Sequence, residues 1–201
     1  MSDKKIAIGI VGSYRKQGVI DTAVSEVLSA LQNLGVEIKK IYLLDYNIEF
    51  CTNCRTCLQP PGVTRGKCIL KDDMEDMLQS IDSADYLIIG APTNAGYVNA
   101  LTQRFIERCV CFGYWPWGTA APVLRNKIIK KKSILVSASA APVLIGKYFN
   151  GTMKALKTLS KYLGAQPIGD IWVGSVTKKE IELSNKIKEK ATTLAQKLIG
   201  K

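Results

Sequence analysis

The chain has 201 residues and a formal net charge of +11, with six cysteines and no histidine. A chain of this length can bury roughly 70% of its unfolded surface and needs no disulfides to fold, and no apolar run approaches the ~20 residues that span a bilayer. Because the N-terminal residues are charged and no signal-peptide segment follows them, we expect a cytoplasmic protein with reduced cysteines, no membrane partner and a single domain over residues 1–201.

The first predicted element is a buried strand from Ile6 to Val11, which leads into the turn Gly12-Ser13-Tyr14-Arg15. A continuous apolar run before a glycine turn and a helix is typical of a parallel strand with its βα loop. Such a loop presents backbone N–H groups and the positive end of the helix dipole to one point, where an anion binds well. We interpret it as a phosphate cradle for a nucleotide-like cofactor. The alternative is a plain strand–helix connection with a solvated Arg15.

The helix after this loop is predicted from about Asp21 to Leu34, because apolar residues repeat at helical spacing and Gly35 follows as a stop signal. As the N-cap, Asp21 would place its carboxylate at the anion site, whereas Thr22 would donate a hydroxyl to phosphate. A second strand, Val36 to Leu44, alternates in its first half, as expected near the edge of a sheet.

A long irregular segment, Asp45 to Lys71, carries four of the six cysteines: Cys51, Cys54, Cys57 and Cys68. Loops this long are either functional or disordered. Three thiolates at two-residue spacing with a fourth nearby suit a [4Fe–4S] cluster, and zinc or metal-free redox or structural thiols fit the same residues. The four are therefore candidate metal ligands. The other two, Cys109 and Cys111, are expected to be packing residues.

The middle of the chain adds a second loop at the carboxyl end of a buried strand. A helix is predicted to begin at Asp72, which has capping-box spacing to Glu75, and a strand that is apolar on both faces follows from Ala84 to Ala91. This strand ends in the loop Pro92-Thr93-Asn94-Ala95-Gly96, and a helix is predicted from about Val98 to Cys111.

Residues 112–132 form an aromatic loop, which begins with the sequence Phe112-Gly113-Tyr114-Trp115-Pro116-Trp117. Three interpretations are open. The aromatic side chains form a small hydrophobic cluster under the loop, a lid over a planar cofactor, or a subunit interface.

The remaining predicted elements are a strand from Ser133 to Ser139, a helix from about Ile145 to Leu163, a strand from Ile168 to Val173 and a helix from about Lys179 to Leu198. Strand and helix thus alternate five times, which predicts a parallel sheet with helices on both faces and ligands at the carboxyl ends of its strands. The lysines of residues 127–132 and 178–201 are not interleaved with aromatic residues, so we expect no nucleic acid partner.

Three motifs give the chain a resemblance to a known family. They are the phosphate loop Gly12-Ser13-Tyr14-Arg15-Lys16-Gln17-Gly18, the loop from Ala91 to Gly96, and the pattern Cys51-x-x-Cys54-x-x-Cys57 with Cys68. With them, nearly the whole chain resembles the NADPH-dependent FMN reductase family of flavodoxin-like proteins, in the branch that includes iron–sulfur flavoproteins. The resemblance implies a flavodoxin-like three-layer α/β sandwich, a five-stranded parallel sheet of order 2-1-3-4-5, and homodimers or tetramers.

The same resemblance implies FMN as the cofactor and NAD(P)H as the co-substrate. The FMN phosphate would be held by Ser13, Arg15, Gln17 and Gly18, and by Val19 and Ile20, which stand where the family has Asn-Thr or Asn-Ser. The flavin ring would be bordered by Pro92, Thr93, Asn94, Ala95 and Gly96. A [4Fe–4S] cluster on the four cysteines is implied by the iron–sulfur relatives, whereas other members carry similar cysteines without a cluster.

Three functions follow as hypotheses. In the first, the protein is an FMN-dependent NAD(P)H oxidoreductase, in which the flavin carries the chemistry and no side chain is an acid–base catalyst. In the second, it is an iron–sulfur flavoprotein that exchanges single electrons with a ferredoxin-like redox protein. In the third, it is a non-enzymatic flavodoxin-like module that senses redox state or binds a partner through the Tyr114–Trp117 loop.

Overall fold

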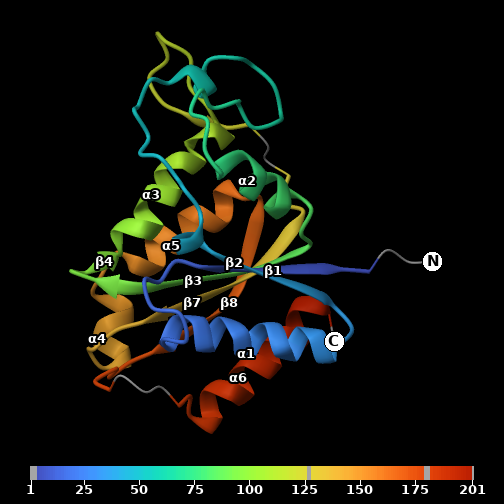
Figure 1. Cartoon of the computed structure of the whole chain (residues 1–201), viewed down its shortest axis with the longest axis vertical. Coiled ribbons are helices and arrows are strands. Elements are labelled where there is room, and N and C mark those ends of the chain that lie inside the picture. Colours follow the sequence, from blue (N-terminus) through green and yellow to red (C-terminus); the bar gives the residue numbers. More distant parts are fainter. Residues whose placement is uncertain (1–3, 126–127, 179–181, 201) are drawn as a thin grey trace.

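The computed structural model describes residues 4–125, 128–178 and 182–200, and it folds as an αβα sandwich around a parallel sheet (Figure 1). The sheet has the order β2-β1-β3-β7-β8. Its strands are β1 (Ile6–Val11), β2 (Glu37–Tyr42), β3 (Tyr86–Asn94), β7 (Lys131–Ala138) and β8 (Ala165–Val173). This confirms the predicted flavodoxin-like fold and the predicted order 2-1-3-4-5.

The two faces of the sheet bury separate apolar clusters because side chains alternate along each strand. In β1, Ile8 and Ile10 pack into one cluster, whereas Ala7 and Val11 pack into the other. One face is covered by α1 (Val19–Asn33) and α6 (Asn185–Ile199). The other is covered by α2 (Met74–Asp82), α3 (Ala100–Arg108) and α5 (Thr152–Tyr162).

Helix α1 lies unusually close to the centre of the sheet. A Cβ atom on Gly9 of β1 would lie 2.7 Å from Leu28, and one on Gly90 of β3 would lie 2.6 Å from Val24. Both distances are below 3.0 Å, so a larger residue at either position would force Leu28 or Val24 to move, and the two glycines allow the present packing of the helix. Val24 and Leu28 are almost fully buried, and such burial contributes about 1.5–3 kcal/mol per side chain. This packing fixes the N-terminus of α1 against the carboxyl ends of β1 and β3.

The structure corrects several predicted boundaries. Helix α1 begins at Val19 rather than Asp21, and α6 begins at Asn185 rather than Lys179, which lies outside the described residues. The segment Pro92–Gly96, predicted to be a loop, instead extends β3 to Asn94 and turns back through β4 (Tyr97–Val98).

The predicted helix from Ile145 to Leu163 is two helices, α4 (Val143–Tyr148) and α5. The break at Gly151 receives the β3–β4 hairpin. The Gly151 N–H donates to the carbonyl of Gly96 at 2.8 Å, and a Cβ on Gly151 would lie 2.4 Å from the Tyr97 ring. A long-range contact of this kind leaves no periodicity signal, so the sequence pattern predicts one continuous helix across the break.

The cysteine loop, residues 45–71, lies beyond the ends of α2 and α3, beside the small sheet formed by β5 (Gly113–Tyr114) and β6 (Val123–Leu124) (Figure 1). Three short 3-10 turns complete the regular structure: η1 (Leu43–Asp45), η2 (Thr56–Leu58) and η3 (Cys109–Phe112). Within the ranges that the structure describes, no helix has both the length and the apolar character needed to cross a bilayer.

Candidate cofactor site and cysteine loop

A cavity of about 220 Å³ lies at the carboxyl ends of β1, β3 and β7. It brings together eight of the residues predicted to hold a cofactor, namely Ser13, Arg15, Gly18, Val19, Ile20, Pro92, Thr93 and Asn94. The end of β7 and the loop after it add Ala138, Ser139 and Ala140, as expected for a ligand site at the carboxyl ends of parallel strands. The predicted residues Gln17, Ala95 and Gly96 do not line the cavity.

The N-terminus of α1 borders this cavity without a side-chain cap, because the N-cap residue is Gly18. The first backbone N–H groups of a helix have no carbonyl partner within it. Those of Val19 and Ile20 belong to this first turn, where the helix dipole contributes positive charge. Backbone N–H donors are therefore present at the two positions where the side chains lack a hydroxyl.

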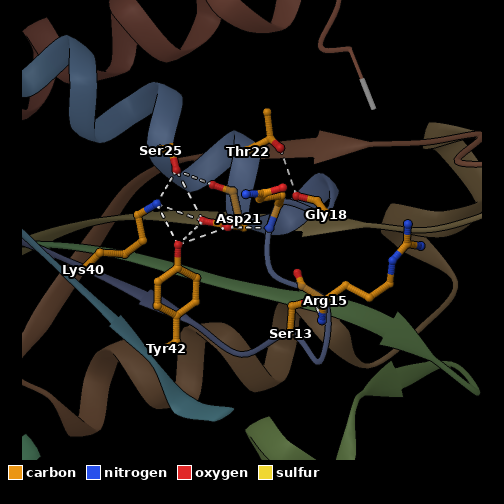
Figure 2. Close-up of polar contacts among 9 residues, drawn as sticks. Ser13, Arg15, Gly18, Asp21, Thr22, Ser25, Lys40 and Tyr42 are labelled. Carbon is orange, nitrogen blue, oxygen red and sulfur yellow. Dashed lines mark hydrogen bonds and ion pairs between the residues drawn. The ribbon is translucent and has the colours of Figure 1, made fainter. Parts of the chain in front are cut away.

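The loop before the helix is shaped by hydrogen bonds of its own. The Oγ of Ser13 accepts from the backbone N–H of Arg15 at 3.1 Å, which closes a tight turn. The Arg15 side chain extends away from α1 (Figure 2) and is exposed at the rim of the cavity. A guanidinium group in this position favours a phosphate ligand.

Asp21 is not the N-cap of α1 and does not line the cavity, so the alternative that places its carboxylate at the anion site is not supported. Its carboxylate is 4% exposed and faces away from the cavity, where it accepts from the N–H of Gln17 at 2.7 Å and from Lys40 Nζ at 2.9 Å (Figure 2). The hydroxyl of Tyr42 also donates to it, at 3.0 Å. Burial raises the pKa of Asp21, but the Gln17 hydrogen bond and the Lys40 ion pair outweigh burial and hold that pKa below its usual value.

This network stabilises the phosphate loop on the side that faces away from the cavity. Gln17 has a left-handed backbone, with φ of 61°, and its N–H bond to Asp21 holds that conformation. Thr22 does not line the cavity, since its hydroxyl donates within the helix to the carbonyl of Gly18 at 3.0 Å. The alternative in which Thr22 donates to phosphate is therefore not supported.

Two residues that hold the same loop were missed in the sequence. The amide of Asn99 and the hydroxyl of Thr102 donate to the carbonyl of Gly12 at 2.8 and 3.0 Å, and Asn99 also caps α3. A Cβ on Gly12 would lie 2.1 Å from the Thr102 hydroxyl, so only glycine fits there. An asparagine three residues before a threonine at a helix start is a recognisable cap signal, but its second contact, 87 residues away in sequence, is not.

The second cofactor loop is a tight hairpin. Its two central residues, Ala95 and Gly96, both have left-handed backbones, with φ of 47° and 79°. This is the geometry of a type I′ turn, which matches the twist of the strands it joins. The hydroxyls of Thr93 and Thr152 lie 2.9 Å apart and connect the hairpin to α5.

The four predicted metal ligands all lie on the loop of residues 45–71. Burial raises the pKa of the Cys57 thiol, and electrostatic interaction with the thiols of Cys68, Cys51 and Cys54 raises that pKa further. Cys57 is buried, Cys51 and Cys68 are half-buried, and Cys54 is exposed. Among the described residues, no group of three or more His, Cys, Asp or Glu side chains is placed so that it could hold a metal ion. The four thiols have the donor chemistry of a [4Fe–4S] cluster, but the structure does not bring them together as a metal site.

The ten-residue gap between Cys57 and Cys68 is closed by a glycine and an arginine. A Cβ on Gly66 would lie 1.8 Å from the carbonyl oxygen of Cys57, so only glycine allows this approach. The Gly66 N–H donates to the carbonyl of Cys111 at 2.8 Å. Arg125 donates to the carbonyls of Cys57 (2.8 Å) and Pro60 (2.6 Å). The loop therefore folds back on itself and carries Cys68 toward Cys57.

The start of α2 differs from the predicted capping box. The carboxylate of Asp72 accepts from the N–H of Met74 at 3.1 Å, so it does bind the first turn. Glu75 instead forms an ion pair with Arg65 on the cysteine loop. The helix itself begins at Met74.

The aromatic loop packs on the cysteine loop. The guanidinium group of Arg55 lies 3.8 and 3.9 Å from the ring centroids of Trp115 and Trp117, and the backbone N–H of Trp115 donates to the carbonyl of Leu58 at 2.9 Å. None of the described residues of the loop lines the cavity at the sheet, so the interpretation as a lid over that site is not supported.

Comparison with known proteins gives one family and several relatives. Residues 6–179 match the model of the family described as NADPH-dependent FMN reductase. An iron-sulfur flavoprotein of Archaeoglobus fulgidus is 31% identical over 150 residues, which are 74% of this chain and 62% of that protein. One from Methanocaldococcus jannaschii is 34% identical over 101 residues, 50% of each chain. The chain thus spans between half and two thirds of the length of these relatives.

Solved structures show the same fold at low identity. An azoreductase from Bacillus anthracis superposes with a TM-score of 0.70 at 14% identity, over 96% of this chain and 99% of that one. An NAD(P)H:quinone oxidoreductase from Methanothermobacter marburgensis superposes with a TM-score of 0.65 at 12% identity, over 98% and 97%.

Proposed function

This chain belongs to the NADPH-dependent FMN reductase family, and we propose that it binds FMN at the cavity beside α1 and passes electrons from NADH or NADPH through it to an acceptor. The observation that carries this proposal is the uncapped N-terminus of α1, which borders the cavity together with Ser13 and Arg15. When bound, the flavin accepts a hydride and releases electrons singly or in pairs.

The residues around the cavity fit this cofactor. Ser13, Gly18 and the backbone of Val19 and Ile20 would bind its phosphate, and Arg15 would add charge at the rim. Pro92, Thr93 and Asn94 would border the ring, where the rigid β3–β4 hairpin fixes its orientation. Gln17, Ala95 and Gly96 would act through backbone conformation, since each has a positive φ. No acid–base side chain is required.

The assembly is proposed to be a homodimer or tetramer. Helix α4 follows the loop after β7 and exposes large apolar side chains, among them Leu144 (68%) and Tyr148 (66%), and its C-cap Phe149 is 81% exposed. Exposed apolar groups this dense are typical of an interaction surface. A second copy of the chain would cover them beside the flavin.

A second candidate function is that of an iron–sulfur flavoprotein, in which electrons leave through a [4Fe–4S] cluster to a ferredoxin-like protein. It is favoured by the presence of Cys51, Cys54, Cys57 and Cys68 on one loop and by the names of the two archaeal relatives. The thiolates would ligate iron directly.

The test of the first function is FMN titration of the purified protein, followed by NADH and NADPH oxidation with the loaded protein. We expect Arg15→Glu to weaken FMN binding by about tenfold to a hundredfold, because reversing a charge beside a phosphate costs roughly 1–3 kcal/mol. Arg104→Glu is the matched control, since Arg104 lies on α3 outside the cavity. Equal affinity in both variants would refute the proposed phosphate site. Iron and acid-labile sulfide analysis after anaerobic purification tests the second function.

A further inference from the structure

A small hollow adjoins the cavity that we propose for FMN. Its volume is about 150 Å³, and its lining residues are Tyr14, Phe50, Ala100, Leu101 and Arg104. Tyr14 borders both spaces, so the hollow and the cavity are neighbours. Sites that enclose a whole ligand typically measure roughly 300–1,000 Å³. The hollow therefore suits one end of a longer molecule whose other end lies in the cavity.

Two exposed aromatic rings line this hollow. Phe50 is 67% exposed and Tyr14 is 51% exposed. The hydroxyl of Tyr14 accepts from the backbone N–H of Leu101 at 3.1 Å, which holds the ring against the first turn of α3. Aromatic side chains at a surface bind nucleic-acid bases by stacking, because every base has a π-face. The rings thus offer a stacking surface for a planar heterocycle.

Arg104 adds a positive charge beside these rings. Its guanidinium carbon lies 5.4 Å from the centre of the Phe50 ring. Among the residues that the structure describes, it has no carboxylate partner, and its Nε is buried without a hydrogen-bond acceptor. Arg108, one turn later in α3, is by contrast paired with the buried carboxylate of Asp72. A guanidinium group that lacks a carboxylate and lies beside a stacking surface is suited to a phosphate, which accepts two parallel hydrogen bonds from it.

We propose that this hollow binds the phosphoadenosine end of NADPH, with the adenine stacked on the rings of Phe50 and Tyr14 and the 2′-phosphate bound by Arg104. The inference rests on the first proposed function and specifies its electron donor. It makes Arg104 the residue that distinguishes NADPH from NADH.

The position of Arg104 selects the 2′-phosphate among the phosphates of the co-substrate. Hydride transfer requires the nicotinamide ring to lie against the flavin, in the cavity that Pro92, Thr93 and Asn94 border. Arg104 lines the hollow and not that cavity, so its charge meets the end of the molecule that lies away from the flavin. In NADPH that end carries the 2′-phosphate, which NADH lacks.

The test uses two probes that contain adenosine and no nicotinamide, 2′,5′-ADP and 5′-AMP, which differ only by the 2′-phosphate. Their binding to the FMN-loaded protein is measured by isothermal titration calorimetry, because bound FMN would occupy the phosphate site beside α1 and leave only the hollow. The KM values for NADPH and NADH are measured on the same samples. The variants are Arg104→Met and Phe50→Ala. The control is Lys186→Met, which removes one positive charge from an exposed position on α6, on the other face of the sheet.

We expect the wild type to bind 2′,5′-ADP about tenfold more tightly than 5′-AMP, which is a typical effect of a charge-assisted hydrogen bond to phosphate. Arg104→Met should abolish this preference and raise the KM for NADPH by about the same factor, with the KM for NADH and the FMN affinity unchanged. Phe50→Ala should weaken both probes and raise both KM values by similar factors, because adenine is common to all four molecules. Lys186→Met should match the wild type.

Three results would overturn the inference alone, in a protein that takes up FMN normally. They are equal affinity of the wild type for the two probes, a preference for 2′,5′-ADP that survives Arg104→Met, and wild-type binding of both probes by Phe50→Ala. A wild-type protein that takes up no FMN would instead refute the first proposed function, and this inference with it.

Discussion

Replacing Asp21 with asparagine should destabilise the protein and loosen its phosphate loop. The carboxylate accepts hydrogen bonds from the Gln17 N–H, Lys40 and Tyr42 at 2.7–3.0 Å, and it is buried beneath the loop. An asparagine keeps one acceptor oxygen but turns an NH₂ group toward donors that need an acceptor, and it leaves Lys40 without its counter-ion.

The magnitude follows from those contacts. Hydrogen bonds to charged groups contribute about 1.5–3 kcal/mol, and the Lys40 side chain remains 27% exposed, so water recovers part of the lost ion pair. We expect a loss of about 2–4 kcal/mol in the free energy of unfolding, equivalent to a Tm lower by roughly 4–16 °C for a chain of this size. Urea denaturation of the flavin-free protein measures the first quantity, and FMN titration measures the effect on the loop.

The pH dependence gives an independent check. The folded-state pKa of Asp21 lies below its unfolded value, so its contribution is complete above about pH 5 and is lost as the pH falls through the folded pKa. The stability difference between wild type and Asp21→Asn should therefore shrink on acidification below about pH 4. Asp45→Asn is the control, because Asp45 pairs with Lys16 on the surface and such pairs contribute about 0–1 kcal/mol. A loss no larger than that of the control would refute the reasoning.

Three further changes test other parts of the structure. Ala95→Asn should raise the free energy of unfolding by about 0.5–1 kcal/mol, because asparagine tolerates the left-handed backbone that strains alanine. Urea denaturation measures this, and a destabilised variant would contradict the type I′ turn. Gly66→Ala should abolish iron retention, because its methyl group would overlap the Cys57 carbonyl. Iron content is measured after anaerobic purification, and iron at the wild-type level would show that the loop folds otherwise. Leu144→Glu should lower the mass found by light scattering without lowering the Tm, since Leu144 is exposed in the single chain, and an unchanged mass would exclude α4 as the interface.

The sequence predicted the sheet well because its strands are short continuous apolar runs with helices at clear periodicity between them. It failed where a distant contact decides local structure. Gly151 breaks the predicted helix in order to receive the Gly96 carbonyl and the Tyr97 ring. At the candidate site, Gly12, Ser13 and Arg15 were recognisable as a motif. The direction of the Asp21 side chain, away from the cavity, could not be predicted, because its partner Lys40 lies on the next strand. The Arg108–Asp72 pair was missed for the same reason.

Helix α3 explains how one short element serves both sites. At its start, Asn99 and Thr102 donate to the Gly12 carbonyl of the phosphate loop. At its end, Arg108 contacts Cys68 of the cysteine loop and Asp72, which follows that loop. Figure 1 shows the helix running from the β3–β4 hairpin toward the cysteine loop. A straight helix rises 1.5 Å per residue, so the two sets of contacts are separated by roughly 13 Å along its axis. Because one helix makes both sets of polar contacts, α3 couples the position of the Gly12 loop to that of the cysteine loop.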